Sequence, residues 1–245
     1  MQFTSIFALA ALSIGQAAAG TLNHRHFHMR SAAHAPMAEV EKRDVLTADA
    51  ASFLNKLGMQ TGTNAASNNG GVWLGKDGDY TNDFINNSTE HIIVAIWGPA
   101  GSWVNAIKPL VTVSLPAGAT RTVSFANGAS GAWAPIYPDT TLTQYGQIGQ
   151  TWGEFTFAGQ WSTVDVSREV LMSGRAMRIE TPKCVSDMET CVFVCDSGET
   201  CLTGYSLKNC APGSQPGAQQ GTYAGAASGG CSGMGDGAKL KTYFY

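Results

Sequence analysis

The chain has 245 residues, of which 44% are hydrophobic, so it can bury one substantial core. It carries 15 basic against 18 acidic side chains, a formal charge of -3, which gives no electrostatic reason to bind nucleic acid or an anionic membrane. Outside the N-terminal segment there is no apolar run as long as a membrane span. We therefore expect neither nucleic acid nor a membrane as a partner.

The N-terminal segment predicts secretion. An apolar run from Phe3 to Ile14, followed by small residues, is typical of a secretory signal peptide over residues 1–19. Residues 20–43 then predict a pro-segment that ends at the dibasic pair Lys42 and Arg43. Cleavage there would leave 11 basic against 16 acidic side chains, about −5, because four basic and two acidic residues precede the cut. We expect a mildly acidic, extracellular protein.

Histidines are concentrated in the predicted pro-segment. His24, His26 and His28 have a spacing that would suit a transition metal on an extended chain, but a removable, flexible tail has the same composition. Only His91 follows that segment. We expect neither a metal nor another cofactor in the mature protein.

A helix and a linker are predicted over residues 44–71. Thr47 or Asp49 can cap the helix, and Gly58 can end it. The polar stretch from Thr61 to Gly71 has no large apolar residue to bury, which is typical of a flexible linker.

Residues 72–183 predict an all-β core, because short apolar segments alternate with Gly, Pro, Asn and Asp at intervals of about ten residues. Ile92–Trp97 is a continuous apolar run and predicts a strand buried on both faces. Leu110–Leu115 and Thr120–Phe125 flank the turn Pro116–Ala119, and this arrangement predicts a hairpin.

Two overlapping glycosylation sequons lie between predicted strands. They begin at Asn86 and at Asn87, and in a secreted chain an occupied sequon requires an exposed loop. We expect at most one of the two to carry a glycan.

A Cys-rich region is predicted over residues 184–245. An even number of cysteines in a secreted protein predicts disulfides, here three bridges with fifteen possible connectivities, and the spacing does not fit a zinc site. The bridges would stabilise a Gly- and Ser-rich excursion before a C-terminal strand, Lys239–Tyr245, returns to the sandwich. The cysteines are Cys184, Cys191, Cys195, Cys201, Cys210 and Cys231.

The segment from Thr151 to Ser167 predicts two neighbouring strands, one with Glu154 and the other with Asp165. Two carboxyl groups can hydrolyse a glycoside when one is protonated and the other is ionised. Glu169 or Asp139 could replace Asp165 as the partner of Glu154. The alternative is that these side chains are solvated on an exposed face, and we do not expect an enzyme.

Tryptophans offer a second way to bind carbohydrate, because indole faces stack on sugar rings. Trp103 and Trp133 lie in Gly-, Ser- and Ala-containing stretches, and Trp152 and Trp161 flank Glu154 in the sequence. These four are candidates for a carbohydrate surface. The alternative is that they belong to the core.

The order of several segments resembles that in thaumatin-like proteins. Gly153–Phe157 is followed by Val164–Ser167 and Ala176–Ile179, and Ile96–Pro99 and Ser130–Trp133 precede them. The resemblance implies a thaumatin-like antiparallel β-sandwich with a disulfide-rich C-terminal excursion. It also implies β-1,3-glucan binding or a weak endo-β-1,3-glucanase activity in an acidic cleft.

That cleft is only partly matched. Glu154 corresponds to its glutamate, whereas Ala132 replaces the arginine, and Ser162 and Val170 replace two aspartates. The resemblance therefore supports the fold more than the activity.

A closer resemblance is to a group of small secreted fungal proteins of allergen and effector type, the Asp f four-like group. Gly131–Trp133, Thr151–Phe155 and Trp161–Ser167 match its motifs. The resemblance implies a secreted, non-enzymatic protein that acts at a host or cell-wall surface. Its expected partner is a host extracellular protein or a wall polysaccharide such as β-glucan, and we expect a monomer.

Overall fold

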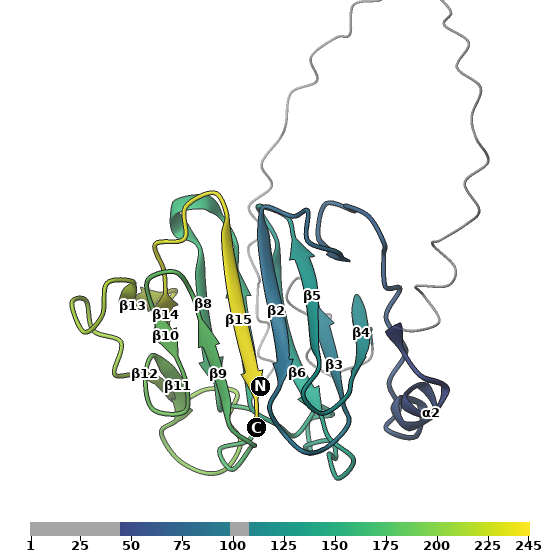
Figure 1. Cartoon of the computed structure of the whole chain (residues 1–245). Coiled ribbons are helices and arrows are strands. Elements are labelled where there is room, and N and C mark those ends of the chain that lie inside the picture. Colours follow the sequence, from purple (N-terminus) through teal and green to yellow (C-terminus); the bar gives the residue numbers. More distant parts are fainter. Residues whose placement is uncertain (1–44, 99–107) are drawn as a thin grey trace, which may run out of the picture. The chain divides into compact units, whose positions relative to one another are not determined.

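The computed structural model describes residues 45–98 and 108–245, which form two facing β-sheets and a helix (Figure 1). The predicted signal peptide, the pro-segment with Lys42 and Arg43, and Trp103 lie outside the described residues. In chain order the elements are α2 (Ala48–Lys56), β1 (Val72–Leu74), β2 (Tyr80–Asn86), β3 (Ile92–Trp97), β4 (Val111–Leu115), β5 (Thr120–Phe125), β6 (Ser130–Ile136), β7 (Trp152–Thr156), η1 (Gly159–Trp161), β8 (Thr163–Ser167), β9 (Met177–Glu180), β10 (Val185–Ser186), β11 (Val192–Cys195), β12 (Tyr205–Lys208), β13 (Ala218–Tyr223), β14 (Ala226–Cys231) and β15 (Ala238–Phe244).

The core lies between the two sheets. The first sheet has six strands in the order β1-β5-β2-β15-β9-β10, and the second follows β12-β11-β8-β7-β6-β3-β4, with the β13–β14 hairpin attached through β8. Aromatic side chains of the two sheets meet in the core. The ring centroids of Phe84 and Trp133 are 5.4 Å apart and those of Phe125 and Phe155 are 4.9 Å apart, both pairs edge to face. The predicted all-β class is confirmed.

Strand direction differs from the prediction at two places. β15 lies between β2 and β9 and runs parallel to β2, and β11 runs parallel to β8 (Figure 1). The prediction of an antiparallel sandwich is wrong for these two pairs, because the alternation of apolar residues reports which side of a strand is buried and not its direction. The thaumatin-like resemblance stays a prediction.

The predicted hairpin around Pro116–Ala119 is also wrong. Its two strands are β4 and β5, and they belong to different sheets, with β4 paired to β3 and β5 paired to β1 and β2. Both strands alternate because each presents an apolar side to the same core. A short turn between two such strands can close a hairpin or cross from one sheet to the other, and the sequence does not distinguish these.

The stretch from Thr61 to Gly71, predicted to be a flexible linker, is fixed along β4. The Asn64 side chain donates to the carbonyl of Thr112 at 2.9 Å and accepts from its amide at 2.8 Å. The amide of Gly62 donates to the Thr112 hydroxyl at 3.0 Å. The prediction is wrong because hydrogen bonds, and not apolar burial, hold the stretch against the edge of the sheet.

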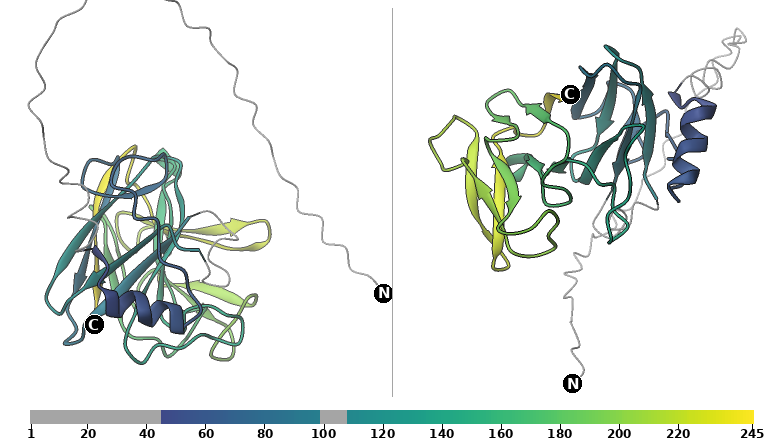
Figure 2. Two further views of the ribbon diagram at one scale, coloured as in Figure 1. Left: turned by 90° about the vertical axis from the view of Figure 1, so that its right-hand side faces the viewer. Right: turned by 90° about the horizontal axis from the view of Figure 1, so that it is seen from below.

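Helix α2 covers part of the outer face of the second sheet. Thr47 caps the helix, since its hydroxyl accepts from the amide of Ala50 at 3.2 Å, and its own amide donates to Ser114 of β4 at 3.0 Å. The buried Leu54 packs in a cluster with Ile93 and other outward-facing residues of this sheet. Figure 2 shows α2 beside one end of the sheet and the β13–β14 hairpin at the other.

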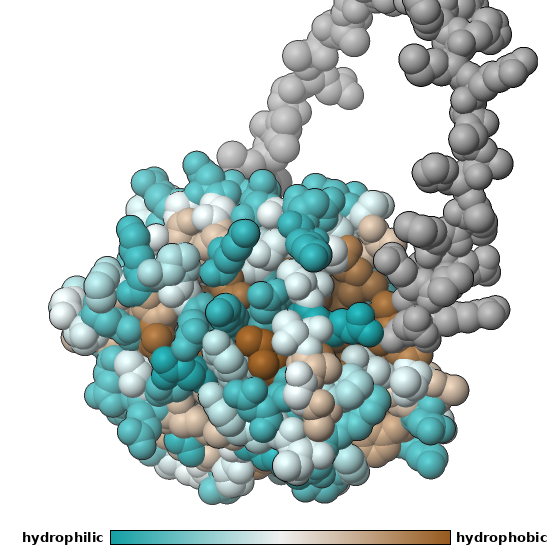
Figure 3. Space-filling view, viewed as in Figure 1, coloured by the Kyte–Doolittle hydropathy of each residue, from teal (hydrophilic) through white to brown (hydrophobic). Residues whose placement is uncertain are grey.

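Hydrophilic residues cover most of the face seen in Figure 3, and hydrophobic residues form only small, separate groups on it. No helix among the described residues is both long and apolar enough to cross a membrane.

Gly153 is required by its neighbour across the sheet. It pairs with Trp133 between β7 and β6, and a Cβ at position 153 would lie 2.2 Å from the Trp133 Nε1. We expect Gly153→Ala to lower the free energy of unfolding by about 1–3 kcal/mol in urea denaturation, as overpacking of a core does. The matched control is Gly221→Ala on β13, where a Cβ meets nothing within 4 Å and a change within about 0.5 kcal/mol is expected. Equal losses in both variants would contradict this account.

Candidate functional site

Two carboxyl groups lie side by side on the outer face of the second sheet. Glu154 of β7 pairs with Asp165 of β8 in the antiparallel ladder. Their sequence neighbours Phe155 and Val164 point into the core, so the two carboxyl groups point to the opposite face. The structure thus places Glu154 and Asp165 on neighbouring strands, as the sequence predicts.

The two carboxyl groups open into a cleft of about 460 Å³, here called the acidic cleft. Glu169, which follows β8, contributes a third carboxyl group to its lining. Phe193 of β11 and Tyr205 of β12 form an aromatic wall, with their rings edge to face at 5.9 Å. A volume of this size is typical of sites for small organic ligands.

The β13–β14 hairpin forms another wall of the acidic cleft, where Gly229 belongs to the lining. At the next residue, Gly230, φ is 123°, and a Cβ there would lie 2.8 Å from the carbonyl of Val164 and 3.1 Å from the Cβ of Asp165. β14 can lie this close to Asp165 only because residue 230 has no side chain.

Burial dominates the electrostatics of the acidic cleft. Burial and the nearby Glu154 raise the pKa of Glu169 to about 8. Burial, together with the charges of Glu154 and Glu169, raises the pKa of Asp165 well above its usual range. Burial also raises the pKa of Glu154, and a hydrogen bond from Ser167 opposes that effect. Asp165 is buried against β14, whereas Glu154 and Glu169 are partly exposed, so the alternative of solvated carboxylates on an exposed face is wrong for Asp165 alone.

Two acceptors in the acidic cleft have no hydrogen-bond donor. They are Oδ1 of Asp165 and Oε1 of Gln147, in side chains that are 5% and 4% exposed. A buried polar atom without a partner costs about 1–3 kcal/mol, so a ligand that donates hydrogen bonds there would recover that energy. The cleft is suited to a donor-rich ligand.

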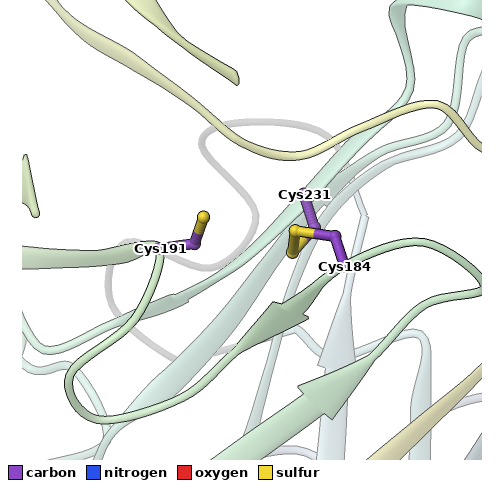
Figure 4. Close-up of side chains that lie close together, drawn as sticks. All are labelled: Cys184, Cys191 and Cys231. Atoms are coloured by element: carbon purple, nitrogen blue, oxygen red, sulfur yellow. A yellow bond between two sulfur atoms is a disulfide. The ribbon is translucent and has the colours of Figure 1, made fainter. Parts of the chain in front are cut away.

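A shared metal ion does not fit the acidic cleft. Among the described residues, only Cys184, Cys191 and Cys231 bring three potential ligand atoms within 4.8 Å of one another. Figure 4 shows these three cysteines, and each is already in a disulfide. The three carboxyl groups are therefore too widely spaced to coordinate one ion together.

The six cysteines form three disulfides, as predicted. Their pairing is one of the fifteen that the sequence allows. The bridge with the largest separation in sequence connects the residue before β10 to the end of β14. It therefore restrains the β13–β14 hairpin, which forms one wall of the acidic cleft. The bridges are Cys184–Cys231, Cys191–Cys210 and Cys195–Cys201.

Asp139, a predicted alternative partner of Glu154, does not line the acidic cleft. It forms an ion pair with Arg175 at 2.9 Å, and Arg175 also pairs with Glu90. Asp139 is therefore excluded as a member of the carboxyl pair, whereas Glu169, the other predicted alternative, belongs to the cleft.

The tryptophan candidates separate into core and surface residues. Trp133 and Trp152 are fully buried, Trp133 between the sheets and Trp152 stacked on Trp97 at 4.9 Å beneath α2. Their assignment to a carbohydrate surface is wrong, because α2 and the facing sheet cover both sides of these strands. Trp161, in contrast, is 70% exposed.

Trp161 lies in a second hollow, here called the Trp161 groove, of about 530 Å³. It belongs to the short η1 helix between β7 and β8, and Asn127, Gln160 and Asp236 surround it. An exposed indole with amide and carboxylate side chains around it is a common arrangement for holding a sugar ring.

The two sequons differ in accessibility. Asn86 is fully buried at the end of β2, and its side-chain amide donates to the carbonyls of Glu90 and Leu115 at 2.8 Å. It cannot accept a glycan without breaking these bonds, so its assignment as a candidate site is wrong. Asn87 is exposed, and its glycosylation stays a prediction.

Sequence reasoning missed three side chains of the acidic cleft, one of which is Phe193 of β11. Gln147 lies in the loop between β6 and β7, and Tyr205 begins β12 in the Cys-rich region. Neither belongs to a recognisable motif. Only the pairing of β12 with β11, and of β11 with β8, brings Tyr205 to the carboxyl groups.

A family model described as Allergen Asp f 4-like domain matches residues 75–225, more than half of the chain. The matched region contains the carboxyl groups and aromatic wall of the acidic cleft, and Trp161. No curated protein matches the chain.

Proposed function

This chain belongs to the Allergen Asp f 4-like family, and from that premise we propose that it is a secreted, non-enzymatic protein that acts outside the cell by binding a cell-wall polysaccharide. An allergen-type family and three disulfides are typical of secreted proteins. The predicted signal peptide and pro-segment support the same location.

One observation carries the choice of ligand. The acidic cleft buries hydrogen-bond acceptors, Asp165 Oδ1 and Gln147 Oε1, that have no donor within the described chain. A saccharide presents many hydroxyl donors on a compact ring, and an aromatic wall offers a flat apolar surface for that ring. The cleft is therefore best suited to part of a sugar chain.

A binding role is favoured over a catalytic one because burial raises the pKa of all three carboxyl groups in the acidic cleft. A glycosidase needs one ionised carboxylate as well as one protonated acid. Within residues 45–98 and 108–245, no basic side chain lines this cleft to keep one of them ionised.

Slow hydrolysis of β-1,3-glucan is the second candidate. It is favoured by the hydrogen bond from Ser167, which stabilises ionised Glu154, while Glu169 with its pKa of about 8 stays protonated at neutral pH. Release of reducing sugar from β-1,3-glucan by the wild type, lost in both Glu154→Gln and Glu169→Gln, would establish it.

The binding proposal is tested by retention on insoluble β-1,3-glucan, chitin and chitosan, with the supernatant compared by gel. We expect retention on at least one polymer, and at least tenfold weaker retention of Asp165→Asn, since the amide group changes the acceptors of a buried side chain and an unmade hydrogen bond there costs about 1–3 kcal/mol. The control is Glu189→Gln, which removes the same charge from an exposed residue outside the cleft. Wild-type protein that stays in solution with all three polymers would refute the proposal and favour the host extracellular protein as partner.

Trp161 supports the same function independently of the acidic cleft. Because its side chain is 70% exposed, we expect Trp161→Ala to change the free energy of unfolding by no more than about 0.5 kcal/mol. If the Trp161 groove also holds sugar, the variant should lose retention on the polysaccharide that the wild type binds, since stacking on an aromatic ring contributes about 0.5–1.5 kcal/mol. Unchanged retention would remove the groove from the binding surface.

A further inference from the structure

The carboxyl groups of the acidic cleft have no cationic partner among the described residues. The ion pairs around Arg175 and Arg178 form elsewhere. Arg168 precedes Glu169 in the sequence, but its guanidinium donates to backbone carbonyls instead. Three acidic groups therefore line one cleft in which the described residues place no positive charge.

A second observation is independent of the acidic cluster. Gln147 comes from a different loop, and its Oε1 is buried in the same cleft without a donor, as is Oδ1 of Asp165. Both atoms are acceptors. A ligand with several donors could supply one to each oxygen.

We propose that the acidic cleft binds its saccharide through a primary ammonium group, so that the ligand is an amino sugar chain rather than a neutral glucan. This inference rests on the proposed function and names the chemical class of the polysaccharide. An ammonium carries three donors and one positive charge, which is what Asp165, Glu154 and Glu169 lack. The ring hydroxyls next to the ammonium supply the donor for Gln147.

A neutral sugar fits the electrostatics less well. Its hydroxyls could satisfy the orphan acceptors, but the buried carboxyl groups would still have to stay protonated or remain unpaired charges. An ammonium pairs with the ionised form and gains a charge-assisted hydrogen bond. Tyr205 and Phe193 also line the cleft, and an aromatic ring can attract a cation as well as a sugar ring.

The cleft has room for a sugar ring. Its volume is about 460 Å³, with the aromatic wall and β14 among its sides, and a site of this size can hold a hexosamine ring as well as an extended polyamine. An amine of either source shares the ammonium chemistry, so the experiment must separate the two.

Binding of an ammonium should also release protons from the protein. Since Glu169 has a pKa of about 8, it is largely protonated at pH 7 when the cleft is empty, and a neighbouring cation favours its ionised form. A neutral sugar would leave those protons in place. Proton release therefore distinguishes the two classes of ligand without any variant.

The test is isothermal titration calorimetry at pH 6, where the glucosamine amines already carry their protons and Glu169 is still protonated, with four probes: a glucosamine tetramer, the matched N-acetylglucosamine tetramer, a β-1,3-glucan tetramer and spermidine. We expect the glucosamine tetramer to bind at least tenfold more tightly than either neutral tetramer and than spermidine. In buffers of different ionisation enthalpy, its binding should release protons. Asp165→Asn and Glu169→Gln should each weaken it at least tenfold, and the control Glu189→Gln should not.

Each other outcome decides a different point. Equal affinity for the three tetramers would overturn the ammonium inference and leave saccharide binding intact. Binding of no tetramer would refute the proposed function, and with it the amino sugar, even if spermidine binds. If Asp165→Asn does not fold, which its melting curve would show, Glu169→Gln and the proton release still decide the question.

Discussion

The protein is expected to be more stable at pH 5 than at pH 8. Glu169 has a pKa of about 8 in the folded chain against an ordinary value of 4.5, so between these values the folded state binds more protons than the unfolded state. The free energy of unfolding therefore falls as the pH rises through this window. Asp165 and Glu154, whose pKa values are also raised by burial, act in the same direction.

The raised pKa of Glu169 alone is enough to set the expected loss in the free energy of unfolding. A shift of that size corresponds to about 5 kcal/mol at most, and because Glu169 is partly exposed we expect a loss of about 2–4 kcal/mol between pH 5 and pH 8. Urea denaturation at the two pH values measures it. Glu169→Gln should be less sensitive to pH and more stable than the wild type at pH 8, while Glu189→Gln should follow the wild type.

The result would also bear on function. A buried carboxyl cluster that destabilises the fold at neutral pH is kept at a cost in stability, as is usual for binding sites. Wild-type stability that rises from pH 5 to pH 8 would show that Glu169 is not protonated in the folded state. The acidic cleft would then not contain a protonated carboxyl group at Glu169.

Much of the carboxyl site could be predicted from the sequence, because it depends on local alternation. Glu154 and Asp165 lie on adjacent strands separated by a short turn, so their pairing needs no information from the rest of the chain. Their burial could not be predicted. It is produced by β14 and by the wall of Phe193 and Tyr205, and these reach the site only through long-range pairing.

The tryptophans show the same limit. Trp133 and Trp161 both stand in stretches with small residues, yet one is fully buried and the other is 70% exposed. The element that faces each side chain decides its burial. Trp133 points at the aromatic side chains of the other sheet, whereas Trp161 lies on the short η1 helix between two strands. The predicted β4–β5 hairpin and the predicted antiparallel direction of β15 were wrong for the same reason, since the residue pattern of a strand does not identify the strand that it pairs with.

Removing the Cys184–Cys231 bridge is expected to cost the most stability of the three disulfides. Its cysteines are 47 residues apart, and the entropy of closing a loop of this length corresponds to about 4 kcal/mol. The double variant Cys184→Ala with Cys231→Ala should therefore lose about that much in urea denaturation. It should also weaken ligand binding in the acidic cleft, because Cys231 ends the strand on which Gly230 lies against Asp165.

The matched control is the shortest bridge, Cys195–Cys201, with a separation of 6 residues and an expected loss of about 2 kcal/mol when both cysteines are replaced by Ala. The order of the two losses tests whether these bridges act by restricting the unfolded chain. If the Cys184–Cys231 variant kept full stability, β14 would be held by its pairing with β8 and β13 alone. Since a single residue pair joins β14 to β8, we expect that pairing to be insufficient, so the covalent bond to Cys184 is what keeps the acidic cleft closed on this side.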